Sequence, residues 1–294
     1  MTGRRVAVVT AARNEAAKIA RTIESVVAQE HRPDRWVIAS DGSTDETDKI
    51  VASYCDQHPW IQLVQVSGDT KRDFASKVHA LKAAVGALGE ITEDYFGVLD
   101  ADIVLEPEHF RILLEEFEND ARLGLVGAQI WEEFDGRRVL HDITKDTVAG
   151  AVQLFRREAY ERTTGFQPLP NGGEDTLAEL EVRMAGWETR TVSHLQATHL
   201  GRVVSGGRSN LAIRFRKGRN QWLFGYGFFF AGVTSIYRMR ARPLVLGGLV
   251  QFAGYLWTAL RRPRRPVSKD LIKWIRREQR AMLRALLTRA NLAR

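Results

Sequence analysis

The sequence contains a single cysteine, Cys55, among its 294 residues, which excludes an intrachain disulfide framework and suits a reducing compartment. Residues 1–15 lack the long apolar run that a secretory signal peptide needs, so we expect this part of the chain to stay in the cytoplasm. Extensive disorder is also excluded, because 44% of the residues are hydrophobic and seven are Trp.

Acidic residues are scarce in the last third of the chain. Residues 201–294 hold 21 Lys and Arg but only two acids, Asp270 and Glu278, whereas residues 1–200 hold 34 acids and 22 bases. Such an asymmetry indicates two regions with different surroundings. We therefore predict a first domain over residues 1–200 and a basic second domain over residues 201–294.

Short apolar runs alternate with helical patterns in the first 200 residues. Strands are expected at 6–10, 36–40, 61–66 and 95–99, and helices at 14–29, about 47–57 and about 75–88. Ser43 and Glu46 have capping-box spacing at the start of the second helix. The repetition predicts an α/β fold with a mixed, mostly parallel sheet that is covered by helices.

Three polar clusters follow these strands, at residues 11–15, 41–43 and 100–102. Ligands of parallel sheets collect at the carboxyl ends of the strands, so we expect the clusters to share one edge. A lone Asp-x-Asp is more often a solvated turn, but the shared edge favours a binding site. Carboxylate oxygens suit Mg²⁺ or Mn²⁺, and such an ion would neutralise a departing diphosphate.

Six segments, spread over about residues 5–200, resemble the family-2 glycosyltransferases of the GT-A fold. They are VVTAARNEAAKIARTIESV (8–26), ASDGSTDETDKIV (39–51), SKVHALKAA (76–84), LDADIVLEP (99–107), FRREAYERTTGF (155–166) and GGEDTLAELEVRMAGWETR (172–190). Each motif is modest alone, and their order and spacing make the resemblance specific.

The resemblance implies a nucleotide-diphospho-sugar donor and an inverting transfer. By position, it places Ala11 and Glu15 beside the nucleotide, Asp41 at the base, Lys77 near the base or the diphosphate, and Asp100 at the ribose or the metal. The family often has two acids before the glycine of the second motif and an aromatic residue in the first. Here a serine and an arginine stand at those positions.

The resemblance also assigns the metal and the catalytic base. Asp102 would hold Mn²⁺ or Mg²⁺, with His199 completing the shell and His194 as the competing histidine. Glu174 and Asp175 would supply the general base, which we assign to Asp175. Alternatively, this acidic pair only caps the helix whose apolar face carries Leu177, Leu180 and Met184, and the two roles are compatible.

The basic region contains two uncharged stretches, 220–237 and 243–260, bordered by arginine clusters. Their length touches the lower limit for a membrane span, but the arginines on both sides of each stretch and five glycines argue against spanning. We expect a helical extension that lies in the membrane interface, together with an amphipathic helix at 270–287. The alternative is a soluble helical subdomain.

The sequence therefore predicts an inverting, metal-dependent glycosyltransferase at the inner face of the cell membrane. A lipid-linked saccharide is the expected acceptor, as in cell-surface polysaccharide or glycolipid synthesis, and nucleic acid is not an expected partner. Two alternatives are a catalytically silent membrane-bound scaffold and a sugar-nucleotide pyrophosphorylase. The second needs a glycine-rich loop after the first strand, and residues 10–17 contain no glycine.

Overall fold

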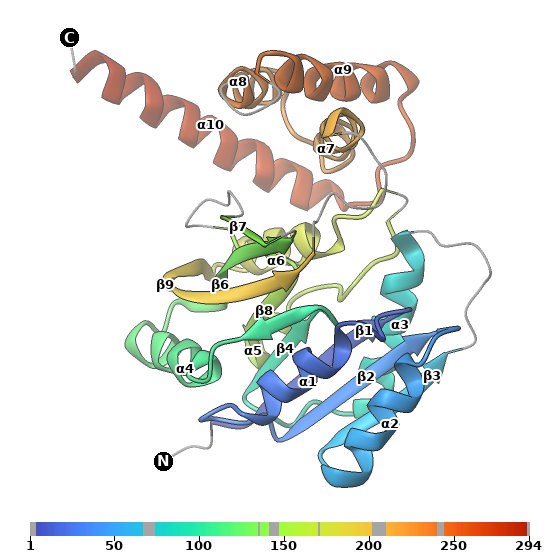
Figure 1. Cartoon of the computed structure of the whole chain (residues 1–294). Coiled ribbons are helices and arrows are strands. Elements are labelled where there is room, and N and C mark those ends of the chain that lie inside the picture. The colour runs from blue at the N-terminus through green and yellow to red at the C-terminus, as the bar shows by residue number, and fades with distance from the viewer. Residues whose placement is uncertain are drawn as a thin grey trace. The chain divides into compact units, whose positions relative to one another are not determined.

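The computed structural model describes residues 4–66, 74–134, 136–140, 147–169, 171–201, 210–239 and 244–292. The chain forms two compact units, Met1–Arg202 and Val203–Arg294. Figure 1 labels their helices and strands.

The first unit is built on one mixed sheet, which confirms the predicted α/β class. Its strand order is β3-β2-β1-β4-β8-β6-β9-β5, and β7 pairs with β6. β1 pairs in parallel with β2 and β4, β2 with β3, and β6 with β9, while the other pairs are antiparallel. The strands are β1 (Val6–Ala12), β2 (Arg35–Asp41), β3 (Ile61–Val66), β4 (Tyr95–Leu99), β5 (Ile103–Leu105), β6 (Leu123–Phe134), β7 (Arg137–Leu140), β8 (Val152–Arg156) and β9 (Glu188–Leu200).

Helices cover both faces of this sheet (Figure 1). They are α1 (Ile19–Val27), α2 (Thr47–Gln57), α3 (Phe74–Leu88), α4 (His109–Asn119), α5 (Arg157–Tyr160) and α6 (Glu174–Met184). Side chains of β1 alternate between two apolar clusters, with Val6 and Val8 in one and Ala7 and Val9 in the other. Because both faces are buried, the central strands are continuous apolar runs.

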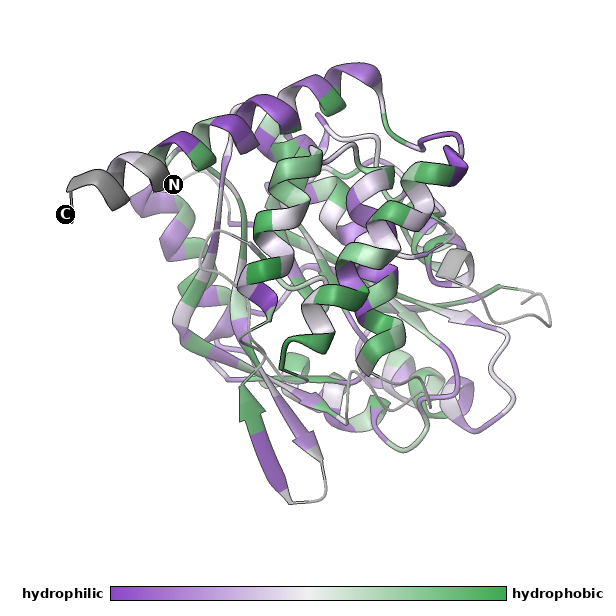
Figure 2. Ribbon diagram, turned by 90° about the horizontal axis from the view of Figure 1, so that it is seen from above, coloured by the Kyte–Doolittle hydropathy of each residue, from purple (hydrophilic) through white to green (hydrophobic). Residues whose placement is uncertain are grey.

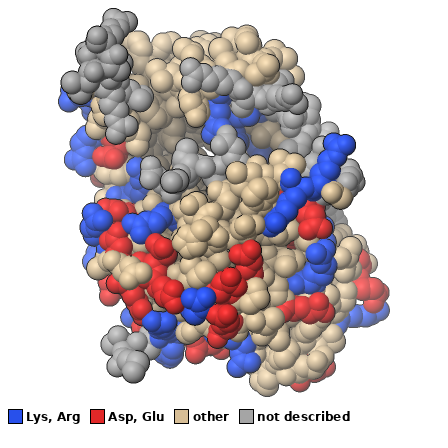
Figure 3. All heavy atoms as spheres, turned by 60° about the vertical axis from the view of Figure 1, so that its left-hand side comes forward, with Lys and Arg blue, Asp and Glu red and all other residues tan. Residues whose placement is uncertain are grey.

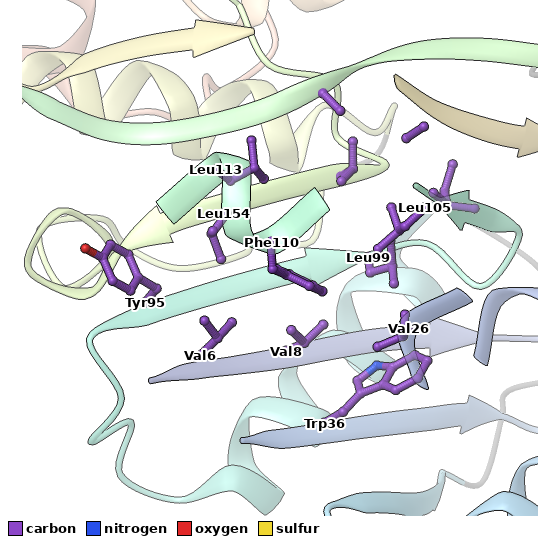
Figure 4. Packing of buried hydrophobic residues seen from close by; sticks show 14 of the residues in the cluster. Val6, Val8, Val26, Trp36, Tyr95, Leu99, Leu105, Phe110, Leu113 and Leu154 are labelled. Carbon is purple, nitrogen blue, oxygen red and sulfur yellow. The ribbon is translucent and has the colours of Figure 1, made fainter. Parts of the chain in front are cut away.

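The larger cluster lies between the sheet and helices α1 and α4. Figure 4 shows Val8 of β1 and Leu154 of β8 close to Phe110 and Leu113 of α4. Trp36 of β2 is fully buried there, and its indole nitrogen donates to the Thr10 hydroxyl at 2.9 Å. This packing fixes the positions of the parallel strands whose carboxyl ends carry the polar loops.

Two local predictions at the helix starts are wrong. The first helix begins at Ile19 rather than at residue 14, because backbone N–H groups of residues 14–16 donate to side chains of residues 43–47, between β2 and the start of α2. The second helix has no capping box: Glu46 makes no side-chain cap hydrogen bond, and the Ser43 hydroxyl accepts from Asn14 N–H. Asp45 bonds the backbone at the start of this helix instead, since its carboxylate accepts from Thr47 N–H at 3.0 Å.

The second unit is helical, with α7 (Asn210–Leu223), α8 (Phe228–Arg238), α9 (Leu246–Arg261) and α10 (Lys269–Leu292). Glycines let these helices approach closely, since a Cβ on Gly218 would lie 1.8 Å from Gln251 O and one on Gly254 would lie 2.1 Å from Phe215 O. Among the described residues, no helix combines the length and the apolar character that crossing a membrane requires.

The polarity of this unit differs from that of the first. Figure 2 shows many apolar, green residues along its shorter helices, whereas the helix leading to the C-terminus is mostly purple and polar. On the face in Figure 3, acidic side chains gather over one part of the molecule and basic or uncharged ones dominate elsewhere.

His109, at the start of α4, is fully buried, and among the described residues neither ring nitrogen has a hydrogen-bond partner. Burial lowers the pKa of His109 to about 3. The unfolded chain, with an ordinary pKa of about 6.5, then binds more protons than the folded protein below that pH. Stability contributed by neutral His109 is therefore lost as the pH falls from about 6.5 towards 3.

We predict that the His109→Leu variant resists acid better than the wild type. Between pH 7.5 and 4.5 the wild type should lose about 2–3 kcal/mol of unfolding free energy that the variant keeps, as measured by urea denaturation. The exposed His79 provides the control, and His79→Gln should follow the wild type. Parallel pH profiles for wild type and His109→Leu would contradict the assignment.

Candidate active site

The loops after β1 and β2 are fastened to each other by hydrogen bonds. Asn14 N–H donates to the Ser43 hydroxyl at 3.2 Å, and Thr44 N–H donates to the Asn14 side-chain oxygen at 2.8 Å. Glu15 N–H donates to the Thr47 hydroxyl at 2.8 Å. Asn14 adopts a left-handed backbone conformation with φ of 55°, which asparagine tolerates better than most residues. The two polar clusters of the first loops therefore form one rigid rim.

Asp41 lies at the end of β2 on this rim, and only 6% of it is exposed. Its carboxylate oxygen lies 3.0 Å from a guanidinium nitrogen of Arg13, the residue that stands where relatives often have an aromatic side chain. Ala11 is half-buried near the end of β1, in register with Ala39 of β2. The nucleotide-binding residues expected from the sequence thus lie on adjacent strand ends.

Asp102 and His199 lie beside each other because β5 pairs antiparallel with β9. Ile103 is in register with His199, and Leu200 N–H donates to the Asp102 carbonyl at 2.8 Å. This pairing brings the His199 Nε2 atom to 3.3 Å from the Asp102 Oδ2 atom. His194, the competing histidine, is exposed and lies at an irregularity of β9.

The chemistry of this pair fits a divalent cation. His199 Nδ1 lies 3.0 Å from the Gly201 carbonyl, which can only accept, so Nδ1 carries a proton and Nε2 is the ring nitrogen that faces the Asp102 carboxylate. A metal-binding histidine commonly donates its other ring N–H to a backbone carbonyl in this way, which fixes the orientation of the ring. No group of three or more His, Cys, Asp or Glu side chains with metal-site geometry occurs in the described part of the chain. Asp102 and His199 would therefore supply two ligands, leaving the others to water and phosphate oxygens.

A lysine already contacts this carboxylate. The Lys18 Nζ atom lies 3.0 Å from Asp102 Oδ2 and 3.1 Å from a carboxylate oxygen of Glu15. Burial lowers the pKa of Lys18, but the attraction of Asp102 and Glu15 outweighs burial and the net pKa is raised. Sequence reasoning missed Lys18, which is one lysine among many until the fold places it here.

A second charged cluster surrounds Lys77 of α3. Its ammonium lies 2.7 Å from an oxygen of Asp100, and it also attracts Glu174 and Asp175 at the start of α6. Burial lowers the pKa of Lys77, but these carboxylates reverse the effect and raise it. Burial raises the pKa of Glu174, and the neighbouring Asp175 raises it further.

Glu174 and Asp175 also bond the backbone at the start of α6. A Glu174 oxygen accepts from Gly173 N–H at 2.9 Å, and an Asp175 oxygen accepts from Thr176 N–H at 2.7 Å. Position 173 requires a glycine, because the backbone there has a φ of 101°, which other residues rarely adopt. On the apolar side of α6, Leu177 and Leu180 are buried as expected, but Met184 is 37% exposed.

Gly150 makes room for Asp175 and was missed at the sequence level. A Cβ atom on Gly150 would lie 2.1 Å from the Asp175 Oδ2 atom. No spacing rule links residues 150 and 175, so this close approach becomes visible only in the folded chain.

The two charged clusters are joined through the turn that contains Asp100 and Asp102. Asp102 belongs to the cluster of Glu15, Lys18 and His199, and Asp100 to the cluster of Lys77, Glu174 and Asp175. The described residues thus place the expected metal ligand, Asp102, in one cluster and the expected base, Asp175, in the other. The two clusters are linked because Asp100 and Asp102 are only two residues apart in the chain.

The sequence of the first unit matches one enzyme family. The sequence model described as "Glycosyl transferase family 2" matches residues 7–171, which is more than half of the chain. Chondroitin synthase of Escherichia coli is 30% identical over 208 residues, covering 66% of this chain and 28% of that protein. The chain therefore spans less than a third of this curated relative.

Solved structures of low sequence identity share the fold. The mannosyltransferase PcManGT from Pyrobaculum calidifontis, in complex with GDP-Man and Mn²⁺, has a TM-score of 0.55 and 19% identity, covering 99% of this chain and 81% of that one. S. aureus TarS 1–349 in complex with UDP-GlcNAc has a TM-score of 0.54 and 16% identity, covering 73% of this chain and 64% of that one.

We predict that the Lys77→Met variant is destabilised at pH 8 and recovers as the pH is lowered. Without the ammonium, Asp100, Glu174 and Asp175 repel one another, at a cost of about 1–2 kcal/mol for this partly exposed cluster. A carboxylate whose pKa is raised in the folded state stabilises the fold on taking up a proton, so the deficit should shrink at pH 5. Urea denaturation at both pH values measures the effect. Lys82→Met, at an exposed lysine of the same helix, is the control, and a deficit that does not change with pH would contradict the prediction.

Proposed function

Because the chain belongs to glycosyl transferase family 2, we propose that it transfers a sugar from a nucleotide-diphospho-sugar donor to an acceptor hydroxyl, with inversion at the anomeric carbon. The observation that carries the proposal is the Asp100–Asp102 turn, which links the Asp102–His199 pair to Glu174 and Asp175. Neighbours of the same fold, in complex with GDP-Man and Mn²⁺ or with UDP-GlcNAc, support this donor class.

In this proposal Asp102 and His199 hold Mn²⁺ or Mg²⁺. When bound, the ion supplies positive charge that stabilises the departing diphosphate. The nucleoside would lie along the rim formed by the first two loops, where Ala11, Glu15 and Asp41 are found. Lys77 would orient Asp100, to which it is paired, towards the ribose or the ion.

Asp175 is the proposed general base. An inverting displacement needs a carboxylate that takes the proton of the acceptor hydroxyl while its oxygen attacks. Within the acidic pair we assign the base to Asp175, and Glu174 beside it has a pKa that is raised by burial and by the charge of Asp175. Gly150, in the turn before β8, leaves room for the Asp175 carboxylate, which a side chain at this position would block.

The second unit supports a membrane-bound acceptor. The polarity of α9 is reversed relative to a helix on a water-facing surface: its buried side includes Gln251 and Thr258, while Leu260 is 82% exposed. In α8, Phe229 is 79% exposed and Ile236 is 64% exposed. Such apolar stripes are stable when they lie in an apolar medium.

Arginines border the apolar stripe on α9. The Arg261 guanidinium lies 4.0 Å from the ring centroid of Trp257, and basic residues continue to Arg265. Tryptophan and arginine together suit the headgroup region of an anionic membrane. We therefore propose that the enzyme lies on the inner face of the cell membrane and glycosylates a lipid-linked saccharide in cell-surface polysaccharide or glycolipid synthesis.

The activity is tested by donor hydrolysis over a panel of nucleotide-diphospho-sugars that includes GDP-mannose and UDP-N-acetylglucosamine. The wild type should hydrolyse at least one donor in Mn²⁺ and much less in EDTA. Asp102→Asn should lose most of the response to metal. Asp175→Asn should keep its donor-induced thermal shift but hydrolyse about 10²–10⁴-fold more slowly.

The matched control is Asp56→Asn, at an exposed acid of α2 that should leave hydrolysis unchanged. If no donor in the panel is hydrolysed or raises the melting temperature, the chain is a silent member of its family. Wild-type rates in the Asp175→Asn variant would remove Asp175 from its role.

The membrane proposal predicts flotation with vesicles that contain phosphatidylglycerol. The double variant Phe229→Ser/Leu260→Ser removes apolar surface from α8 and α9, and it should bind at least about tenfold more weakly. Val139→Ser/Leu140→Ser, at exposed apolar residues of β7, is the control and should float like the wild type. Equal flotation of both double variants, or no flotation of the wild type, would favour a subdomain that does not contact lipid.

A further inference from the structure

Lys18 and the proposed metal ion would use the same oxygen atom. The Lys18 ammonium lies 3.0 Å from Asp102 Oδ2, and His199 Nε2 lies 3.3 Å from that atom. A divalent ion ligated by this carboxylate and this imidazole would therefore stand within a few ångströms of an ammonium. Two cations so close repel each other strongly, and they compete for one carboxylate.

We infer that Lys18 is an internal counter-ion that occupies Asp102 in the donor-free protein and weakens metal binding there. This inference rests on the proposed function. It makes Lys18 a positioning residue: the metal binds well only when the diphosphate of the donor adds negative charge and further oxygen ligands. Metal and donor binding are then coupled, because each is weak without the other.

Lys18 has a second ion-pair partner close to Asp102. Glu15, three residues earlier, contacts the same ammonium at 3.1 Å, so Lys18 keeps one partner when it leaves Asp102. The Lys18 side chain is 34% exposed, and its four-carbon stem is flexible. The backbone is fixed at this point, because Lys18 N–H donates to the Glu15 carbonyl at 2.8 Å immediately before α1. Only the side chain needs to move.

If the Lys18 ion pairs were purely structural, removing Lys18 would have a different effect. If Lys18 only stabilises the loop after β1, its removal lowers stability and leaves the metal affinity unchanged or reduced, because the ligands become less ordered. If Lys18 competes with the metal, its removal raises the metal affinity even when the fold is weakened. The sign of the change in metal affinity separates the two roles.

The experiment titrates Mn²⁺ alone into the donor-free protein and follows free Mn²⁺ by electron paramagnetic resonance. Lys18→Met should bind Mn²⁺ at least about tenfold more tightly than the wild type, since an ammonium close to the ligand oxygen is gone. Lys18→Arg, which keeps the charge, should bind no more tightly than the wild type. Lys82→Met should match the wild type, and adding Asp102→Asn to Lys18→Met should abolish the gain.

Unchanged or weaker Mn²⁺ binding by Lys18→Met would overturn the inference, and so would a gain that survives Asp102→Asn. These outcomes differ from a failure of the proposed function. In that case the wild type neither hydrolyses any donor nor responds to Mn²⁺ in the presence of donor. An enzyme that is active and metal-dependent, yet has the same Mn²⁺ affinity with and without the Lys18 charge, refutes only the role of Lys18.

Discussion

The balance of charge around the turn at residues 100–102 is the constraint on which the rest of the site depends. Carboxylates from three parts of the first unit converge there, and they repel one another unless cations lie between them. Lys77 pairs with Asp100 at 2.7 Å, and Lys18 pairs with Asp102 at 3.0 Å. A concentration of acids of this kind costs stability, and it is common where a protein binds cations or moves protons.

The parallel part of the sheet makes this convergence possible. β1 pairs with both β2 and β4, so their carboxyl ends lie next to one another and their loops share one rim. The antiparallel pairing of β5 with β9 then brings His199, which lies near the end of the first unit in sequence, next to Asp102. The core packs against both faces of the sheet, and this packing holds the loops in place without contributing to their chemistry.

The two units differ in which residues they bury and which they expose. The first buries apolar strands and displays its charges, as a protein in water does. In the second, small and polar residues such as Ser235 and Gln251 are buried between helices while large apolar side chains are exposed. Close helix packing at glycines explains the first part of that pattern, since residues without side chains let the backbones meet. We propose that the exposed apolar side chains contact the interior of an anionic membrane.

The sequence by itself determined the class of the fold, the places of the first four strands and the loops that carry the acids. These features follow from local periodicity and from Asp-rich segments at strand ends, which a single chain displays openly. The tertiary structure decided the partners. Ser43 bonds Asn14 instead of capping its own helix, Gly150 makes room for Asp175, and Lys18 shares Asp102 with His199. Each of these contacts joins residues at least 25 positions apart, and no local pattern specifies which distant group a polar side chain will meet, because chain folding alone sets that distance.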